Sequence, residues 1–209
     1  MKLITTLGLV TAFVVTQSAY AEGMSYDYVE GGYRHFTWNA SAAGYPDHNY
    51  NGAFLGGSKS LNEHFFIQGA VAYVESSWND PGDHEELEQT DIMASVGARF
   101  PINANTDLNA SVGVWSYSGT ISSQKDRRTY GGSGDFVRTS LGLRHRLNAK
   151  TELNGSYDHA TANQNETDLT YVNFGVTHEI APHYKLGITL FKTLSHDIRG
   201  GDIYLRYDF

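Results

Sequence analysis

Two histidine–aspartate neighbours are the residues of this sequence that could most readily perform acid–base chemistry. Asp158 is followed by His159, with Thr161 two positions further on. A second pair, His196 and Asp197, stands near the C-terminus. A hydrolase needs a base that is hydrogen-bonded to a nucleophile or a water and is oriented by a third group. Because neighbours on a β-strand point to opposite faces, Asp158 and His159 could not cooperate on a strand. We therefore predict no catalytic residue.

Metal chemistry has equally little support in the sequence. The nine histidines are scattered. The closest pairs, His145 with His159 and His178 with His183, lack a spacing that strand geometry would turn into a ligand set. The chain contains no cysteine, which excludes disulfides and cysteine-ligated zinc or iron–sulfur sites. We predict no metal and no cofactor.

The composition points to strands. Charged residues make up 18% of the 209 residues, against roughly a quarter in ordinary globular chains. Aromatic residues make up 13%, and there are 14 Tyr and 22 Gly, a mixture that favours β-structure. The net charge of −8 argues against a nucleic-acid partner. The mean hydropathy of −0.39 argues against a bundle of transmembrane helices.

Residues 1–21 have the pattern of a signal peptide. Lys2 precedes an apolar run from Leu3 to Val15, and Ala19-Tyr20-Ala21 matches a cleavage site. The run is too short to cross roughly 30 Å of hydrocarbon comfortably. We expect export and cleavage after Ala21, which leaves residues 22–209 as one domain.

That domain alternates apolar with small or polar residues at period two, as β-strands do. A soluble sandwich also alternates, but here the polar face is mostly Gly, Ser, Ala and Asn, which suits a crowded lumen. Short polar turns, such as 62–64 and 148–151, alternate with long polar segments, such as 79–86 and 119–135. Gly131-Gly132-Ser133-Gly134 is expected in one of these long loops. The pattern predicts an all-β, transmembrane, up-and-down antiparallel barrel of ten strands, or of eight if one hairpin is misread.

The last strand carries a resemblance to a known family. Ile203, Leu205, Tyr207 and Phe209 share one face and end on an aromatic residue. In this the chain resembles small bacterial outer-membrane β-barrel proteins of the OmpA/OmpX type. The resemblance implies that these four residues form the signal read by the barrel-assembly machinery. Residues 26–33 are also similar to the first strand of the diffusible-signal-factor-regulated outer-membrane proteins.

The inward face of the predicted barrel carries charges of both signs. Small barrels have just enough interior for side chains, and a charge in a low dielectric needs a partner. We therefore expect an ion-pair network in the lumen rather than a pore lining, with Glu30 and Asp158 on the same face. The predicted network is Arg34, Lys59, Asp91, Arg99, Arg138, Arg144, Glu152, Glu179, Lys185 and Arg206.

The predicted loops carry charges that could bind the cell surface. Lys125, Arg127 and Arg128 could meet lipopolysaccharide phosphates. We expect a monomer in the cell outer membrane, with lipid, lipopolysaccharide and the barrel-assembly machinery as partners. Its expected role is structural, or surface interaction through five external loops, without catalysis. A narrow channel for ions or small solutes is the alternative. An outer-membrane hydrolase or lipid A-modifying enzyme is the least favoured function.

Overall fold

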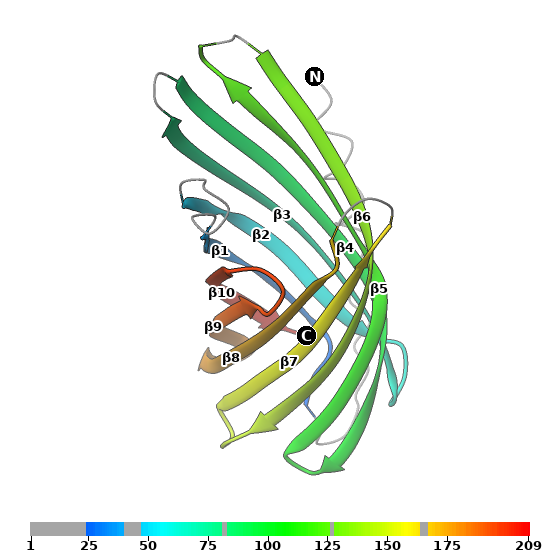
Figure 1. Cartoon of the computed structure of the whole chain (residues 1–209). Helices are drawn as coiled ribbons and strands as arrows, with labels where there is room; N and C mark the ends of the chain where they lie inside the picture. Colours follow the sequence, from blue (N-terminus) through cyan, green and yellow to red (C-terminus); the bar gives the residue numbers. More distant parts are fainter. Residues whose placement is uncertain (1–23, 40–46, 81–82, 126–127, 164–166) are drawn as a thin grey trace.

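Ten antiparallel strands close into a single barrel (Figure 1). The computed structural model describes residues 24–39, 47–80, 83–125, 128–163 and 167–209; the expected signal peptide and its cleavage site lie outside them. Each strand pairs with its neighbour in sequence, and β1 pairs with β10 to close the wall. The prediction of ten strands is confirmed. The strands are β1 (Tyr28–Trp38), β2 (His48–Ser60), β3 (Phe65–Asp80), β4 (Asp83–Asn103), β5 (Thr106–Ser123), β6 (Arg128–Arg146), β7 (Thr151–Ala162), β8 (Leu169–Ala181), β9 (Tyr184–Thr193) and β10 (Ile198–Asp208).

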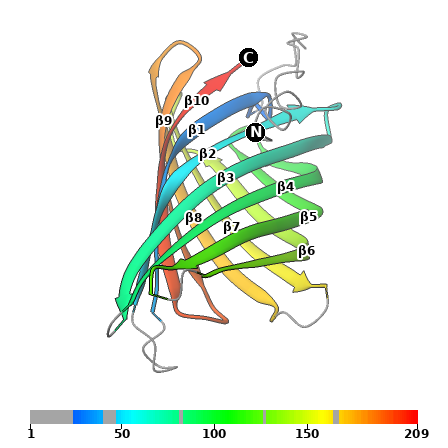
Figure 2. The ribbon, with the colours of Figure 1, turned by 90° about the horizontal axis from the view of Figure 1, so that it is seen from above.

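The two ends of the barrel differ in their connections. Turns of a few residues join β2 to β3, β4 to β5, β6 to β7 and β8 to β9 at one end. The first and last described segments meet at this end, where the Phe209 amide donates to the Asp27 carbonyl over 3.1 Å. Short turns face the periplasm in outer-membrane barrels, so we call this the periplasmic end and the opposite one the external end. Figure 2 shows the tilted strands side by side around the wall.

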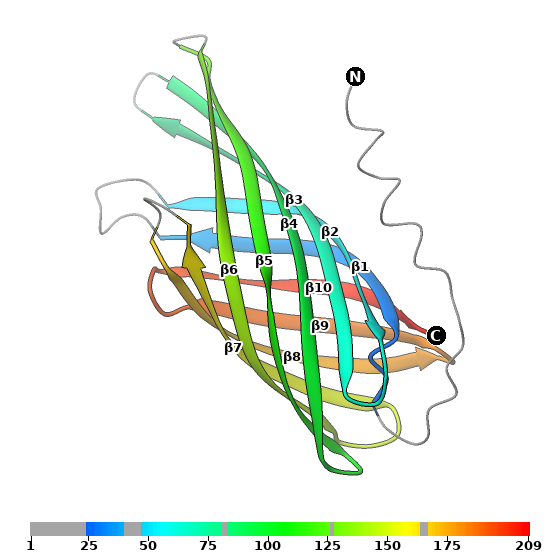
Figure 3. The same ribbon diagram turned by 90° about the vertical axis from the view of Figure 1, so that its right-hand side faces the viewer.

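The strands are unequal in length. β3, β4, β5 and β6 contain 16, 21, 18 and 19 residues, whereas the other six contain 10 to 13. Their hairpins extend past the external ends of the other strands (Figures 1 and 3). We call residues 76–80, 83–89, 117–123 and 128–134 the projecting sheet.

The projecting sheet corrects one expectation from the sequence. Residues 79–86 and 119–135, expected as long loops, are largely strand, and Gly131–Gly134 lies within β6. Their cross-strand pairing continues in register to Asp80↔Asp83 and Ser123↔Arg128. Alternation of apolar residues marks only strands with one face on lipid or a core. A strand with water on both faces keeps its backbone pairing without that pattern.

The outer wall below the projecting sheet is apolar. Large aliphatic and aromatic side chains point outward at alternate positions and are 46–60% exposed, among them Val96, Val112, Val114, Leu141, Phe174 and Leu190. A continuous exposed apolar band of this kind fits a lipid-facing surface. No helix in the described part of the chain is both long and apolar enough to span a bilayer.

Candidate functional site: the lumen and the projecting sheet

Arginine–carboxylate pairs between neighbouring strands fill the lumen. Each arginine lies on the inward face of its strand, and its carboxylate lies opposite or diagonal to it on the next strand. Charge-assisted contacts this short are among the stronger polar interactions in proteins. The pairs are Arg34–Asp202 at 2.8 Å, Arg138–Asp158 at 2.6 Å, Arg144–Glu152 at 2.6 Å and Arg206–Glu30 at 2.7 Å.

The same guanidinium groups also lie over aromatic rings. Such cation–π contacts gain strength where water is excluded, so ring and carboxylate together hold each arginine inside the barrel. The contacts, measured from the guanidinium carbon to the ring centroid, are Arg206 over Tyr28 at 4.0 Å, Arg144 over Tyr26 at 4.3 Å, Arg34 over Phe54 at 5.4 Å and Arg138 over Tyr171 at 5.5 Å.

The remaining residues of the predicted network have other partners. Asp91 accepts hydrogen bonds from the Trp115 indole at 2.9 Å and from Gln89 at 3.0 Å. Glu179 lies across from Lys185 in the β8–β9 pairing. The Lys185 ammonium contacts Asp208 at 2.6 Å. Arg99 lies 4.0 Å from Asp107.

Lys59 corrects the sequence interpretation. It alternates with Ser58 and Ser60 along β2 and lies beside Ile67 of the outward row in β3. Its ammonium contacts Asp27 at 3.0 Å and lies 5.1 Å from the centroid of the Phe209 ring. The predicted position of Lys59 in the lumen is therefore wrong, because it belongs to the periplasmic rim.

Two carboxylates of the lumen were missing from the predicted inward face. Asp202 and Asp208 stand at even positions with Arg206. Period-two counting from Arg206 would have found both. The carboxylate that each arginine contacts depends on the register between neighbouring strands, and the sequence of one strand does not give that register.

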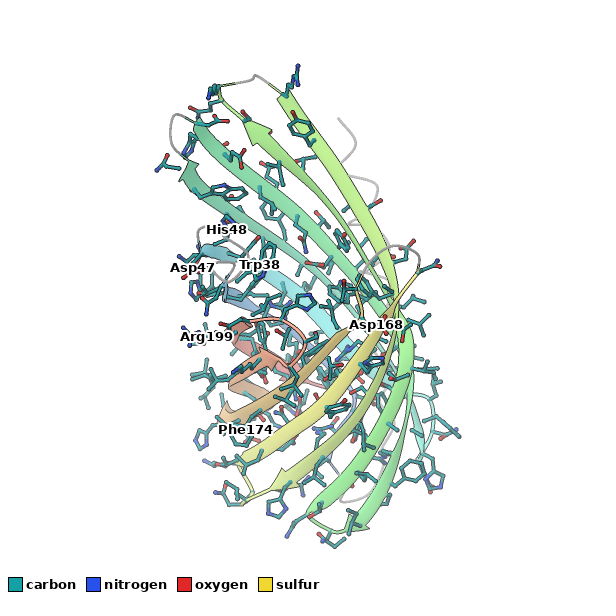
Figure 4. All side chains as sticks on the ribbon, viewed as in Figure 1. Trp38, Asp47, His48, Asp168, Phe174 and Arg199 are labelled. Carbon is teal, nitrogen blue, oxygen red and sulfur yellow. The ribbon has the colours of Figure 1, made fainter. Side chains whose placement is uncertain are left out.

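The candidate catalytic histidine belongs to a recurring pair. His159 Nδ1 contacts Thr170 Oγ1 at 2.9 Å, and its Nε2 lies 3.7 Å from Asp168 (labelled in Figure 4). Two further histidines pair in the same way with the threonine directly opposite them, at strand ends on the outer face: His145 with Thr106 at 2.9 Å and His178 with Thr151 at 3.0 Å. The repeat indicates a structural pairing at the ends of strands rather than a catalytic centre. No group of three metal-ligating side chains is arranged to hold an ion within the described residues.

Aromatic rings narrow the external mouth of the lumen. Trp38 and His48 lie together at the external ends of β1 and β2 (Figure 4), with ring centroids 5.8 Å apart. Trp78 packs on His48 at 4.2 Å. Deeper in the lumen, Phe36 stacks on Tyr50 at 4.5 Å. Aromatic rings thus line the external mouth, whereas ion pairs line the middle of the lumen.

The outer face of the projecting sheet is polar. Its small side chains carry hydroxyl groups, and carboxylates stand beside them. β6 pairs with β5 along residues 128–134, but β7 begins to pair with β6 only at Phe136. Residues 128–134 are therefore an edge of the projecting sheet, with no described strand on the side away from β5. The outward residues include Ser77, Glu86, Glu88, Ser118, Thr120, Ser122, Thr129 and Ser133.

Asp83 links the two projecting hairpins. The Ser123 hydroxyl and the Lys125 backbone amide both donate to its carboxylate. These two hydrogen bonds hold the pKa of the Asp83 carboxyl below its usual range, and the bond from Ser123 has the larger effect. Lys125 and Arg128 therefore lie at the external tip, as the lipopolysaccharide hypothesis requires. Arg127 lies outside the described residues.

A closed up-and-down barrel with an apolar outer band and an ion-paired lumen defines a transmembrane β-barrel. The model of the outer membrane protein beta-barrel domain family matches residues 5–179, and the chain belongs to this family. Its location is the outer membrane, and the resemblance to small outer-membrane barrels is confirmed.

Several solved structures resemble this chain at low sequence identity. The translocator domain of autotransporter NalP from Neisseria meningitidis is 11% identical, with 90% of each chain covered and a TM-score of 0.55. The attachment invasion locus protein Ail of Yersinia pestis is 16% identical over 87% of this chain and 99% of its own, with a TM-score of 0.43. The KdgM porin is 9% identical over 87% of this chain and 99% of its own, with a TM-score of 0.44. No curated protein matches the sequence.

Proposed function

We propose that this protein is a non-catalytic barrel that acts at the cell surface through its projecting sheet. The observation that carries the proposal is the continuation of β3–β6 as paired, polar strands beyond the apolar band. A bilayer crossing needs only about 9–11 residues per strand, so the additional residues serve no membrane purpose. Asp83 ties the two hairpins together, which gives the sheet a fixed shape for contacts.

The proposed partner is the lipopolysaccharide of the surrounding outer leaflet. Lys125 and Arg128 stand at the tip of the β5–β6 hairpin, and Arg127 lies between them in sequence. Arginine forks suit phosphate oxygens, while the hydroxyl-rich outer face suits sugar hydroxyls. We further propose that the protein is a monomer and that Ile203, Leu205, Tyr207 and Phe209 serve recognition by the assembly machinery. The first three are outward-facing and 37–48% exposed.

A shortened hairpin tests the proposed function. Ser118 and Ser133 face each other directly, so residues 119–132 can be replaced by Asn-Gly, a turn that suits two paired strands. Barrels in lipopolysaccharide-free nanodiscs are then offered lipopolysaccharide micelles. We expect the shortened barrel, and Lys125→Gln with Arg128→Gln, to bind clearly less than the wild type. Equal binding by barrels that still shift in gel mobility on boiling would overturn the proposal.

The narrow channel is the second candidate function. It is favoured by a polar cavity of about 160 Å³ in the lumen. The ion pairs and rings around it oppose an open path, so we expect no stepwise current from the wild-type protein in planar bilayers. Stepwise currents would favour the channel.

A further inference from the structure

We propose that residues Met24–Asp27 are a plug that closes the periplasmic side of the lumenal cavity and can be released from it. These residues precede β1 and are called the plug segment below. The inference goes beyond the proposed surface function, which depends only on the projecting sheet at the other end of the barrel.

The plug segment is largely buried, although none of its residues belongs to a strand. Met24 and Tyr26 are each only 2% exposed, and Met24–Asp27 has no strand assignment. The Tyr26 ring lies 4.6 Å from the ring of Phe66 and 4.3 Å below the guanidinium of Arg144. Phe66 and Arg144 face the lumen from β3 and β6. The phenol therefore enters the barrel instead of continuing along the wall.

Arginines of the wall hold the main chain of the plug segment. Arg99 Nη1 donates to the carbonyl of Met24, and Arg144 Nη1 donates to the carbonyl of Ser25, each over 2.9 Å. At the rim, the Asp27 carboxylate accepts from Lys59. Met24 and Ser25 are thus held by side chains of β4 and β6, while Asp27 is held by Lys59 and by the main-chain amides of Ser60 and Phe209.

Tyr26 forms part of the lining of the lumenal cavity. The cavity of about 160 Å³ extends from Tyr26 toward Arg138, and its lining includes Arg144, Ser140 and Arg206. The Tyr26 hydroxyl and Arg138 Nε are buried, with no hydrogen-bond partner among the described residues. Buried polar groups nearly always have partners, and a polar space of this volume has room for several waters. The cavity is therefore a hydrophilic compartment with the plug segment on its periplasmic side.

Release of the plug segment leaves the barrel wall intact. Among the described residues, the main chain of Met24–Tyr26 takes no part in the strand pairing, and the main-chain bond of the segment to the wall is the one from Phe209 to Asp27 at its base. Arg144 keeps Glu152 as its partner when Ser25 and Tyr26 depart. Segments that lack a continuous hydrogen-bond ladder open at a lower free-energy cost than the paired strands around them. The open form would admit small polar solutes from the periplasm into the cavity.

Thiol labelling tests the plug, because the chain has no native cysteine. Ser140→Cys places a single thiol in the cavity lining, and a small charged methanethiosulfonate reports its accessibility in nanodiscs. Adding Tyr26→Ala should raise the labelling rate about tenfold, the factor expected from losing roughly 1.4 kcal/mol of cation–π and ring contact. Adding Tyr157→Ala, which removes an outward ring that is 51% exposed, should leave the rate unchanged.

A second variant keeps the test decisive if Tyr26→Ala does not fold, as judged by gel mobility before and after boiling. Asp27→Asn weakens the attachment at the rim without touching the cavity, and we expect it to accelerate labelling as well. Labelling of the folded variants at the wild-type rate would overturn the plug. That result would leave the lipopolysaccharide assay untouched, so the two proposals fail separately.

Discussion

Strands β3–β6 pass through two regions that share one backbone pattern and differ in side chains. In the membrane part, Val112 and Val114 face outward, and Arg138 and Arg144 fill the lumen. In the projecting sheet the outward positions of the same β5 strand are Ser118 and Thr120. Cross-strand pairing runs through both without interruption. Backbone hydrogen bonds therefore form the strands in both regions, while the outward side chains determine whether a strand faces lipid or water.

The largest difference between the regions is expected at a buried ion pair. Arg144→Ala leaves the Glu152 carboxylate buried without its partner, which typically costs ~3–5 kcal/mol. Arg128→Ala at the exposed tip should change the free energy of unfolding by less than about 0.5 kcal/mol. Urea unfolding in lipid vesicles, followed by tryptophan fluorescence, measures both. Similar losses for the two variants would mean that the lumenal pair is no more desolvated than the tip.

The cost of a charge on the outward face distinguishes positions that face lipid from positions that face water. Val114→Arg places a guanidinium in the apolar band and should cost ~2–4 kcal/mol near the bilayer centre. Ser118→Arg, four residues further along the same face of β5, should cost less than about 0.5 kcal/mol. The same unfolding assay applies. Equal costs would show that the membrane boundary does not lie between these two positions.

Glycine substitutions compare packing in the two regions. A Cβ on Gly97 would overlap the ring of Phe66, which is 2% exposed and packed on Tyr26, whereas a Cβ on Gly132 would meet no atom within 4 Å. Gly97→Ala should therefore destabilise the barrel by ~1–3 kcal/mol. Gly132→Ala should be neutral or slightly stabilising, because alanine restricts the unfolded chain. Thermal unfolding of the two variants, side by side, tests the contrast; a tolerant Gly97 would indicate a loosely packed lumen.

The smallest effect is expected at the periplasmic rim, which is neither lumen nor projecting sheet. Burial raises the pKa of the Asp27 carboxyl, but hydrogen bonds from Ser60 and Lys59 outweigh it and hold the pKa below its usual range. A carboxyl whose pKa is lower in the folded than in the unfolded protein stabilises the fold in its ionised form. This contribution is complete above the unfolded-state pKa of ~3.9 and is lost as the pH falls through the folded-state pKa. Asp27 is only 6% exposed, and its hydrogen-bonded carboxylate should contribute about 1 kcal/mol.

The measurement is the difference in unfolding free energy between wild type and Asp27→Asn as a function of pH. The wild type should be more stable at pH 6, and the difference should vanish toward pH 2. A difference that is constant over this range would show that the carboxylate charge at Asp27 contributes nothing.

The fold was largely readable from the sequence because period-two alternation is a local property. It gave the ten strands and the common outward face of Ile203, Leu205 and Tyr207. Ion-pair partners were not readable in the same way: Arg34 and Asp202 are 168 positions apart, and their meeting depends on barrel closure. The polar strand around Thr120 carries no alternation to detect, and Tyr26 shares the parity of Glu30 without revealing that its main chain turns inward.

The direct facing of Ser118 and Ser133 has a consequence for how such a protein can diverge. Adding or removing two residues on each arm of the β5–β6 hairpin keeps every remaining side chain on its original face. Each such step changes the height of the tip along the strand by roughly 7 Å. Insertions and deletions of this kind would leave the embedded barrel untouched, so the hairpin could follow changes in the thickness of the sugar layer around the cell, one paired step at a time.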